Sequence, residues 1–201
     1  MNRPYRNIVI AHHLIWTGYG WWLPNDPRGS MSRTVASDVI AELGKLHYGR
    51  RKVQPAGWVI REFYEKAKGV LQHDLLAFTP EETSTIAAGF GNLCAGNPYT
   101  CYACAILPDH VHVLLRKHRR TAEQMIEDLQ EASRDALRDL PRRRGHPVWG
   151  GPGWKVFLRT GDDVRRTIRY IEDNPAKLRR PRQQWEFVTE YDGWPLHKRK
   201  D

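Results

Sequence analysis

The sequence contains no apolar run of the ~20 residues that a membrane-spanning helix needs. Residues 2–7 are polar and basic and lead into only a short apolar stretch, so they do not form a secretory signal. Cysteine is scarce: the three residues at positions 94, 101 and 104 are an odd number lying close together, which does not make a disulfide framework. These absences indicate a cytoplasmic protein with no membrane partner.

A Gly-rich phosphate loop, internal repeats and low-complexity tracts are also absent, and 201 residues suit one domain. Strands that follow one another, with helices interspersed, favour an α+β antiparallel sheet with helices packed mainly on one face. We expect a single domain over 1–180, with 30–70 as an insertion, and a loosely attached basic tail over 181–201. Strands are predicted over 7–17, 70–78, 99–107, 110–115 and 154–159, and helices over 38–48, 61–68, 80–93, 121–140 and 161–174.

Basic side chains exceed acidic ones by 32 to 23, which gives a formal net charge of +9. They gather in several short runs rather than in one tail, which indicates a polyanion partner; the alternative is a solvated basic surface. Eight Trp and eight Tyr could stack on single-stranded bases, although most should be core residues. The candidate residues for contact with this polyanion are Arg116, Lys117, Arg119, Arg120, Arg142, Arg143, Arg144, Arg179, Arg180 and Arg182.

One stretch, Leu107–Leu115 (LPDHVHVLL), organises the rest of the chain. His110 and His112 alternate with apolar residues at the period of a half-buried strand, so both imidazoles leave the same face. Two imidazole nitrogens at fixed spacing make half of a divalent-metal site. The remaining ligand must come from another element.

Two other groups of residues compete for this role. Cys101 and Cys104 with the two histidines have the spacing of a structural zinc site, but they lie in a predicted strand, where positions three apart face opposite ways. Buried strand cysteines are the favoured interpretation. His12 and His13 are adjacent in a strand, so only one can face a given site, and each is interpreted as a packing or hydrogen-bonding residue.

The last predicted helix offers a better partner. Tyr170 and Asn174 are four residues apart and so share one helical face. The amide oxygen of Asn174 could be a third ligand to a hard cation, and the phenol of Tyr170 would then lie beside a bound phosphate. The alternative is that Tyr170 is a core or rim residue and that Asn174, before a proline, ends the helix.

The ordered pair of motifs resembles the two signatures of the HUH single-tyrosine transposases, in particular the branch of REP-associated tyrosine transposases (REP, repetitive extragenic palindromic). The first is LPDHVHVLL, and the second, about 55 residues later, is RYIEDNP at 169–175. The opening segment 16–29 is similar to the first strand and loop of some members. The chain departs from the family in lacking a Gly soon after Asn174-Pro175 and in its long 30–70 segment.

The resemblance implies a ferredoxin-like antiparallel sheet with the HUH strand central. It implies a divalent metal, Mg or Mn, held by His110, His112 and Asn174, and it makes Tyr170 the nucleophile. The partner would be single-stranded DNA with hairpins, and the protein would be nucleoid-associated, as a monomer or a homodimer.

The expected activity is that of a single-strand DNA endonuclease and strand transferase. Attack by tyrosine would retain the phosphodiester energy in a 5′-phosphotyrosine, which the free 3′-OH could later reverse onto another 5′ end. Two alternatives stay open. One is a non-catalytic, domesticated protein that binds hairpins without cutting them, and the other is a metal-dependent nuclease that uses water.

Overall fold

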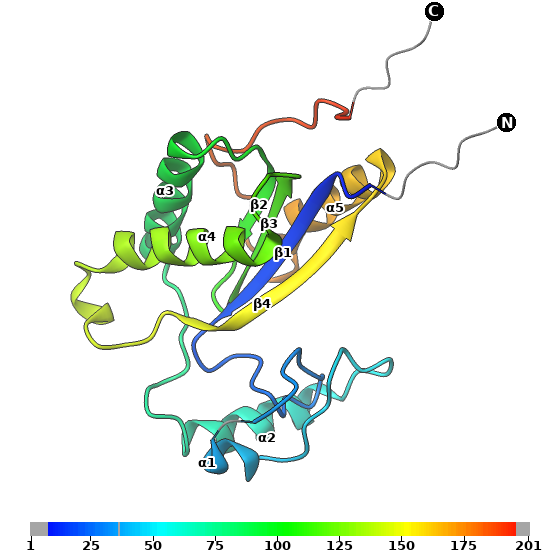
Figure 1. The fold of residues 1–201 in the computed structure, drawn as a ribbon. Coiled ribbons are helices and arrows are strands. Elements are labelled where there is room, and N and C mark those ends of the chain that lie inside the picture. Colours follow the sequence, from blue (N-terminus) through cyan, green and yellow to red (C-terminus); the bar gives the residue numbers. More distant parts are fainter. Residues whose placement is uncertain (1–7, 36, 196–201) are drawn as a thin grey trace, which may run out of the picture.

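The computed structural model describes residues 8–35 and 37–195, and its core is a four-stranded antiparallel sheet (Figure 1). The strand order is β2-β3-β1-β4, and the strand with the two histidines, β3, is an inner strand. The strands are β1 (Ala11–Gly18), β2 (Cys101–Ile106), β3 (His110–Arg116) and β4 (Trp149–Leu158). The helices are α1 (Asp38–Ala41), α2 (Gly57–Lys68), α3 (Pro80–Gly96), α4 (Ala122–Leu137), the 3-10 turn η1 (Pro141–Arg143), α5 (Gly161–Glu172) and α6 (Asn174–Lys177).

Without α1 and α2, the elements up to β4 follow the order β-α-β-β-α-β, with strand neighbours that match the predicted ferredoxin-like sheet. Helices α3 and α4 cover one face and α5 covers the other, so the helices are mainly on one face (Figure 1). The fold class and the inner position of the two-histidine strand predicted from the sequence are therefore confirmed.

Local sequence sets where the two large helices, α3 and α4, begin. Thr79 and Thr121 are N-caps whose hydroxyls accept from the amides of Glu82 and Gln124, and these side chains accept in return from the cap amides. Such capping boxes satisfy amides that the first helical turn leaves unpaired. In α5 the cap is Thr160, whose hydroxyl accepts from the Asp163 amide.

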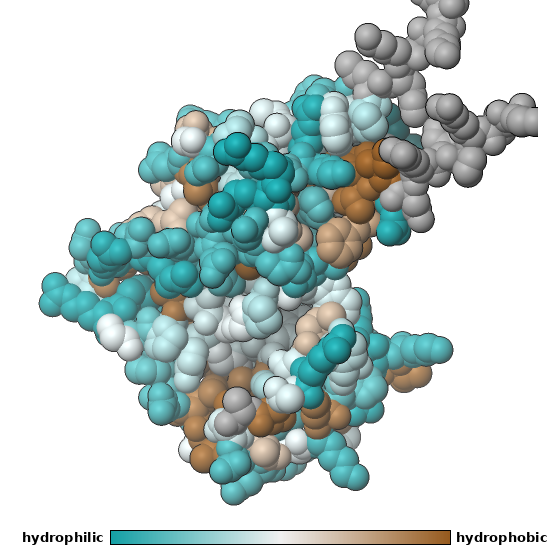
Figure 2. All heavy atoms as spheres, viewed as in Figure 1, coloured by the Kyte–Doolittle hydropathy of each residue, from teal (hydrophilic) through white to brown (hydrophobic). Residues whose placement is uncertain are grey.

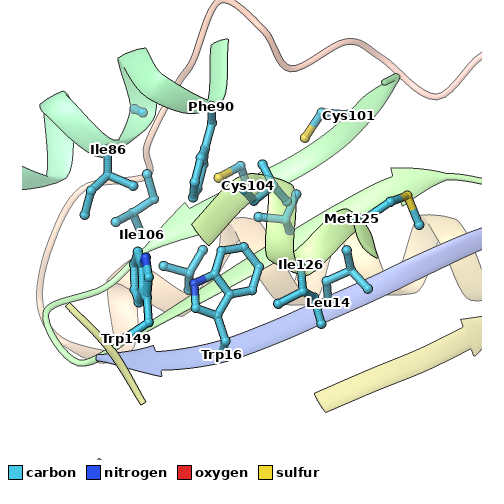
Figure 3. Packing of buried hydrophobic residues seen from close by; sticks show 14 of the residues in the cluster. Leu14, Trp16, Ile86, Phe90, Cys101, Cys104, Ile106, Met125, Ile126 and Trp149 are labelled. Atoms are coloured by element: carbon cyan, nitrogen blue, oxygen red, sulfur yellow. The ribbon is translucent and has the colours of Figure 1, made fainter. Parts of the chain in front are cut away.

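The main core lies between the sheet and the pair α3 and α4 (Figure 3). Trp16 from β1 packs edge to face against Phe90 of α3 and against Trp149 of β4. Gly89 allows α3 to approach α4 closely, because a Cβ there would lie 2.9 Å from the carbonyl oxygen of Ala132. A smaller cluster under α5 includes Leu114 and Ile171, which holds α5 against β2 and β3.

Two predicted elements are wrong. Residues 70–78 form no strand: they are a loop whose Leu76 and Phe78 side chains are buried in the main core. Their backbone amides donate to the carbonyls of Tyr19 and Pro108 rather than to a neighbouring strand. Apolar residues of a core loop and of a strand look alike in sequence. The helix predicted over 38–48 ends at Ala41.

The C-terminal segment is not loosely attached, contrary to the prediction. The Gln183 side chain donates to the carbonyl of Ile106 and accepts from its amide, each at 2.8 Å, along the free edge of β2. The Thr189 amide donates to the Cys101 carbonyl, and Phe187 packs against Phe90. The segment thus covers a sheet edge, which would otherwise expose unpaired backbone groups. The last part of the predicted tail, 196–201, lies outside the described residues.

The 18–33 loop is anchored to α2 by a buried ionic cluster. Asp26 is 1% exposed, and its carboxylate accepts from the Arg28 guanidinium at 2.7 and 2.9 Å. The Tyr64 hydroxyl of α2 donates to the same carboxylate and accepts from Arg28. The segment predicted as an insertion therefore holds the loop after β1 in place.

Candidate active site

The site lies on the face of the sheet that α5 covers. His112 is 4% exposed and His110 is half-buried, and their rings are 4.9 Å apart between centroids. Between them Val111 points to the other face and joins the main core. The alternation predicted from the sequence therefore places both imidazoles on one face of β3.

Each imidazole is held through its Nδ1 atom. His112 Nδ1 lies 2.9 Å from Nε2 of His13, and His110 Nδ1 lies 2.7 Å from Oδ1 of Asp109. Because an ionised carboxylate only accepts, the His110 Nδ1 atom donates in this contact, which in the neutral imidazole leaves a lone pair on Nε2. The tautomer in which His112 donates to His13 gives the same result for His112. Outer partners of this kind orient imidazoles that bind metals.

Burial keeps His13 and His112 neutral. It lowers the pKa of His13 to about 4, and it lowers the pKa of His112 well below its usual value, with further contributions from His110, His13 and Lys177. A neutral imidazole is the form that binds a metal.

Tyr170 lies beside His13 and His112, near the end of α5. Its ring is 5.6 Å from the ring of His112 and 6.1 Å from that of His13, and 45% of the residue is exposed. The ammonium group of Lys177 lies 4.2 Å from the centroid of the same ring. Tyr170 thus combines contact with the buried histidines and access for a large substrate.

Asn174 does not lie in the same helix as Tyr170, contrary to the prediction. Helix α5 ends at Glu172, and Asn174 begins the short helix α6 before Pro175. Asn174 is nevertheless 5% exposed, and its Oδ1 atom accepts from Lys177 Nζ at 2.8 Å. Among the described residues its Nδ2 atom has no hydrogen-bond partner. Lys177 therefore bridges the amide of Asn174 and the ring of Tyr170.

Sequence reasoning missed three members of this site. His13 was interpreted as a packing or hydrogen-bonding residue, which is correct, but its partner is His112. In the β1–β3 register His13 is opposite Leu114, so His112 is its diagonal neighbour on the same face. Asp109 lies inside the first motif and Lys177 lies two residues after the second, and their polar side chains were the only available signal.

The zinc alternative fails for a different reason from the one predicted. A register shift between Cys101 and Ala103 turns both Cys101 and Cys104 to the same face, that of the main core. His112 lies on the opposite face, so the cysteines and histidines cannot share an ion. Among the described residues, no group of three or more His, Cys, Asp and Glu side chains could hold a metal.

The basic candidates are divided by the structure. The prediction that Arg143 contacts a polyanion is wrong. Arg143 is 7% exposed and its guanidinium is paired with buried Glu82, so it is not available to a phosphate. Figure 2 shows hydrophilic atoms over most of the face that carries α4 and hydrophobic atoms gathered over α1 and α2. Arg116, Arg120, Arg142 and Arg182 have acidic partners, whereas Lys117, Arg119, Arg144, Arg179 and Arg180 are exposed.

The donor atoms of these residues are of the kinds that a divalent cation takes. In the tautomers that donate through Nδ1, the Nε2 atoms of His110 and His112 are left for a ligand, and the Asn174 Oδ1 atom already contacts a cationic group. Two imidazoles and an amide oxygen are a donor set for Mg or Mn with open positions for phosphate oxygens.

No helix within the described ranges is long and apolar enough to cross a membrane. No protein-family profile matches the sequence. Among solved structures, a REP-associated tyrosine transposase bound to a REP hairpin covers 89% of this chain and 73% of its own, at 12% identity and a TM-score of 0.45. A provisionally named transposase from Deinococcus radiodurans covers 86% of this chain and 95% of its own, at 15% identity and a TM-score of 0.40.

A Haemophilus influenzae protein provisionally named a REP-associated tyrosine transposase is 22% identical over 118 residues. The match covers 54% of this chain and 67% of that protein. The resemblance predicted from the two motifs is therefore confirmed: this chain is similar to a REP-associated tyrosine transposase.

Proposed function

We propose that this protein is a metal-dependent single-strand DNA endonuclease and strand transferase that acts at REP hairpins through a 5′-phosphotyrosine. The observation that carries the proposal is the contact of the half-exposed Tyr170 ring with the buried His13–His112 pair. The sequence similarity to a REP-associated tyrosine transposase supports the class of substrate.

The phenol of Tyr170 would lose its proton to solvent as its oxygen attacks the phosphorus atom. The bond from phosphorus to the 3′-oxygen would break, and the 3′-oxygen would take up a proton from solvent and leave as a hydroxyl. Mg or Mn held by His110, His112 and Asn174 would supply charge neutralisation at the non-bridging oxygens. The exposed ammonium of Lys177, next to the Tyr170 ring, would add positive charge beside the same phosphate. Reversal with a different 3′-OH would join two strands without an external energy source.

The remaining positive charge suits a hairpin backbone. Arg179 and Arg180 follow α6 and are exposed, and Lys117 and Arg119 are exposed beyond the end of β3. Contacts between such side chains and phosphates release counterions, so binding should weaken steeply with salt. The preference for unpaired DNA follows from the need to separate the scissile phosphate from a regular duplex.

The test is a covalent-adduct assay. Incubation of the protein with MnCl2 and a labelled single-stranded oligonucleotide that contains a REP hairpin should give a protein–DNA adduct stable to denaturing electrophoresis, and EDTA should prevent it. Cut DNA without an adduct would instead support water as the nucleophile. Tight hairpin binding with neither cutting nor adduct would support a domesticated binding protein.

His13 should determine metal affinity without being a ligand. Replacing His13 by phenylalanine removes the partner of His112 Nδ1, and loss of such an outer partner costs about 10- to 100-fold in metal affinity. His13→Gln, which keeps a hydrogen-bonding group, should lose less. The measurement is isothermal titration with MnCl2, and the control is His12→Gln, since His12 points away from His112. Unchanged affinity in His13→Phe would contradict this role.

A further inference from the structure

Trp22 is an exposed aromatic residue next to the two-histidine strand. It lies in the loop after β1, and 37% of the residue is exposed. Its ring centroid is 6.2 Å from that of His110, at an interplanar angle of 69°. The indole is therefore close to one of the two imidazoles to which the metal is assigned.

The backbone at Trp22 is held in an uncommon conformation. Its φ is +52°, in the left-handed region that a bulky side chain rarely adopts. Such conformations persist only where the surroundings over-determine them, and they concentrate at ligand-binding sites. Here the Trp22 amide donates to the Tyr64 hydroxyl at 2.9 Å, so α2 fixes the turn.

The indole is fixed as firmly as the backbone. Its Nε1 atom donates to the Gly29 carbonyl at 3.1 Å, and the Arg28 guanidinium carbon lies 3.7 Å from its ring centroid. Arg28 is in turn bound to buried Asp26 and to Tyr64. The ring is thus pre-organised, and little further entropy would be lost when a ligand stacks on it.

Trp22 can offer a ligand only the π-surface of its indole ring. Its only polar atom is already used within the loop, so it cannot read a ligand through a hydrogen bond. A flat, electron-deficient ring beside phosphate-binding groups is the ligand that such a surface fits, and stacking accepts every nucleobase. An apolar peptide would gain nothing from the adjacent cation Arg28.

We propose that Trp22 is a stacking platform for an unpaired nucleobase next to the scissile phosphate, clamped by Arg28, Asp26 and Tyr64. The proposal rests on the proposed function, because it takes single-stranded DNA as the ligand. It assigns a role to the 30–70 segment: α2 carries Tyr64, which locks the platform. Its stacking energy would add affinity without adding sequence preference.

The test compares the binding of an oligonucleotide that has bases with the binding of one that lacks them. Fluorescence anisotropy in EDTA, where no cleavage occurs, would measure binding of labelled oligo(dT) and of an abasic oligomer of equal length. Trp22→Ala should weaken oligo(dT) binding by about 5- to 100-fold and abasic binding by less than about twofold. Trp22→Phe should keep most of the affinity. Trp58→Ala is the matched control, because Trp58 is 62% exposed and lies on α2.

If Trp22→Ala lost equal affinity for both oligomers, or none for oligo(dT), the proposal that Trp22 stacks on a base would be overturned. Trp22→Gly suits the positive φ and serves as a second variant, with its melting temperature measured alongside. Photocrosslinking of wild-type protein to a bromouracil-substituted oligomer needs no variant: a crosslink at Trp22 supports the platform, and crosslinks only elsewhere refute it. Because neither measurement requires cutting, failure to form the covalent adduct would refute the proposed catalysis and leave the platform result standing.

Discussion

Tyr170→Phe is expected to abolish the covalent protein–DNA adduct and to slow strand cleavage by about 10⁴-fold or more, which is typical for loss of a nucleophile. The change removes one oxygen atom and keeps the ring that packs against His112 and His13. The fold and the affinity for MnCl2 should therefore be unchanged. Adduct formation by gel electrophoresis and metal binding by calorimetry would be measured on the same preparation.

Tyr48→Phe is the matched control for this prediction, since Tyr48 is 50% exposed. It should form the adduct at the wild-type rate. If Tyr170→Phe still cleaved DNA at an undiminished rate but formed no adduct, water would be the nucleophile. If it formed the same adduct, another residue would carry the DNA and the role of Tyr170 would be wrong.

Glu82→Gln is expected to lower the free energy of unfolding by about 3–5 kcal/mol. The side chains of Glu82 and Arg143 are each 3% exposed, and their charged groups are 2.5 Å apart. The amide variant would leave the guanidinium of Arg143 buried without a counter-charge. Glu82 also accepts from the Thr79 amide at 2.8 Å, and glutamine can keep this contact, as Gln124 does in α4, so the loss should come from the ion pair. Chemical denaturation would measure the loss.

The neighbouring Glu81→Gln, in an exposed position of the same turn, should change stability by less than about 0.5 kcal/mol. Replacing both partners, in Glu82→Gln with Arg143→Met, should cost less than the sum of the single changes, because no buried charge is then left alone. An additive double variant would mean that the pair is not coupled.

The same pair gives a pH dependence with a definite sign. Burial alone would raise the pKa of Glu82, but the hydrogen bond and charge of Arg143 lower it below the usual 4.5. The native state therefore binds the proton less readily than the unfolded state. The contribution to stability is complete above about pH 4.5 and is lost as the pH falls through the lowered pKa, and Glu82→Gln should lack this part of the acid sensitivity.

Local patterns explain why much of the fold was predictable. The period-2 alternation of His110 and His112 fixes the face of β3, and the threonine caps with their Glu and Gln partners fix where α3 and α4 begin. These features depend on residues a few positions apart. The loop at 70–78 shows the limit, because its apolar side chains fill the core without pairing as a strand.

The strand period alone places His110 and His112 on one face, because successive side chains of a strand alternate between its two faces. The same kind of reasoning failed for Asn174, which begins α6 after α5 has ended at Glu172. By contrast, the tertiary fold sets the contact of His13 with His112, the burial of Arg143 with Glu82 and the position of Trp22 beside His110. These contacts join residues far apart in the chain. They depend on strand register, on a β-bulge in β2 and on the packing of α2 against the loop after β1, which no local periodicity specifies.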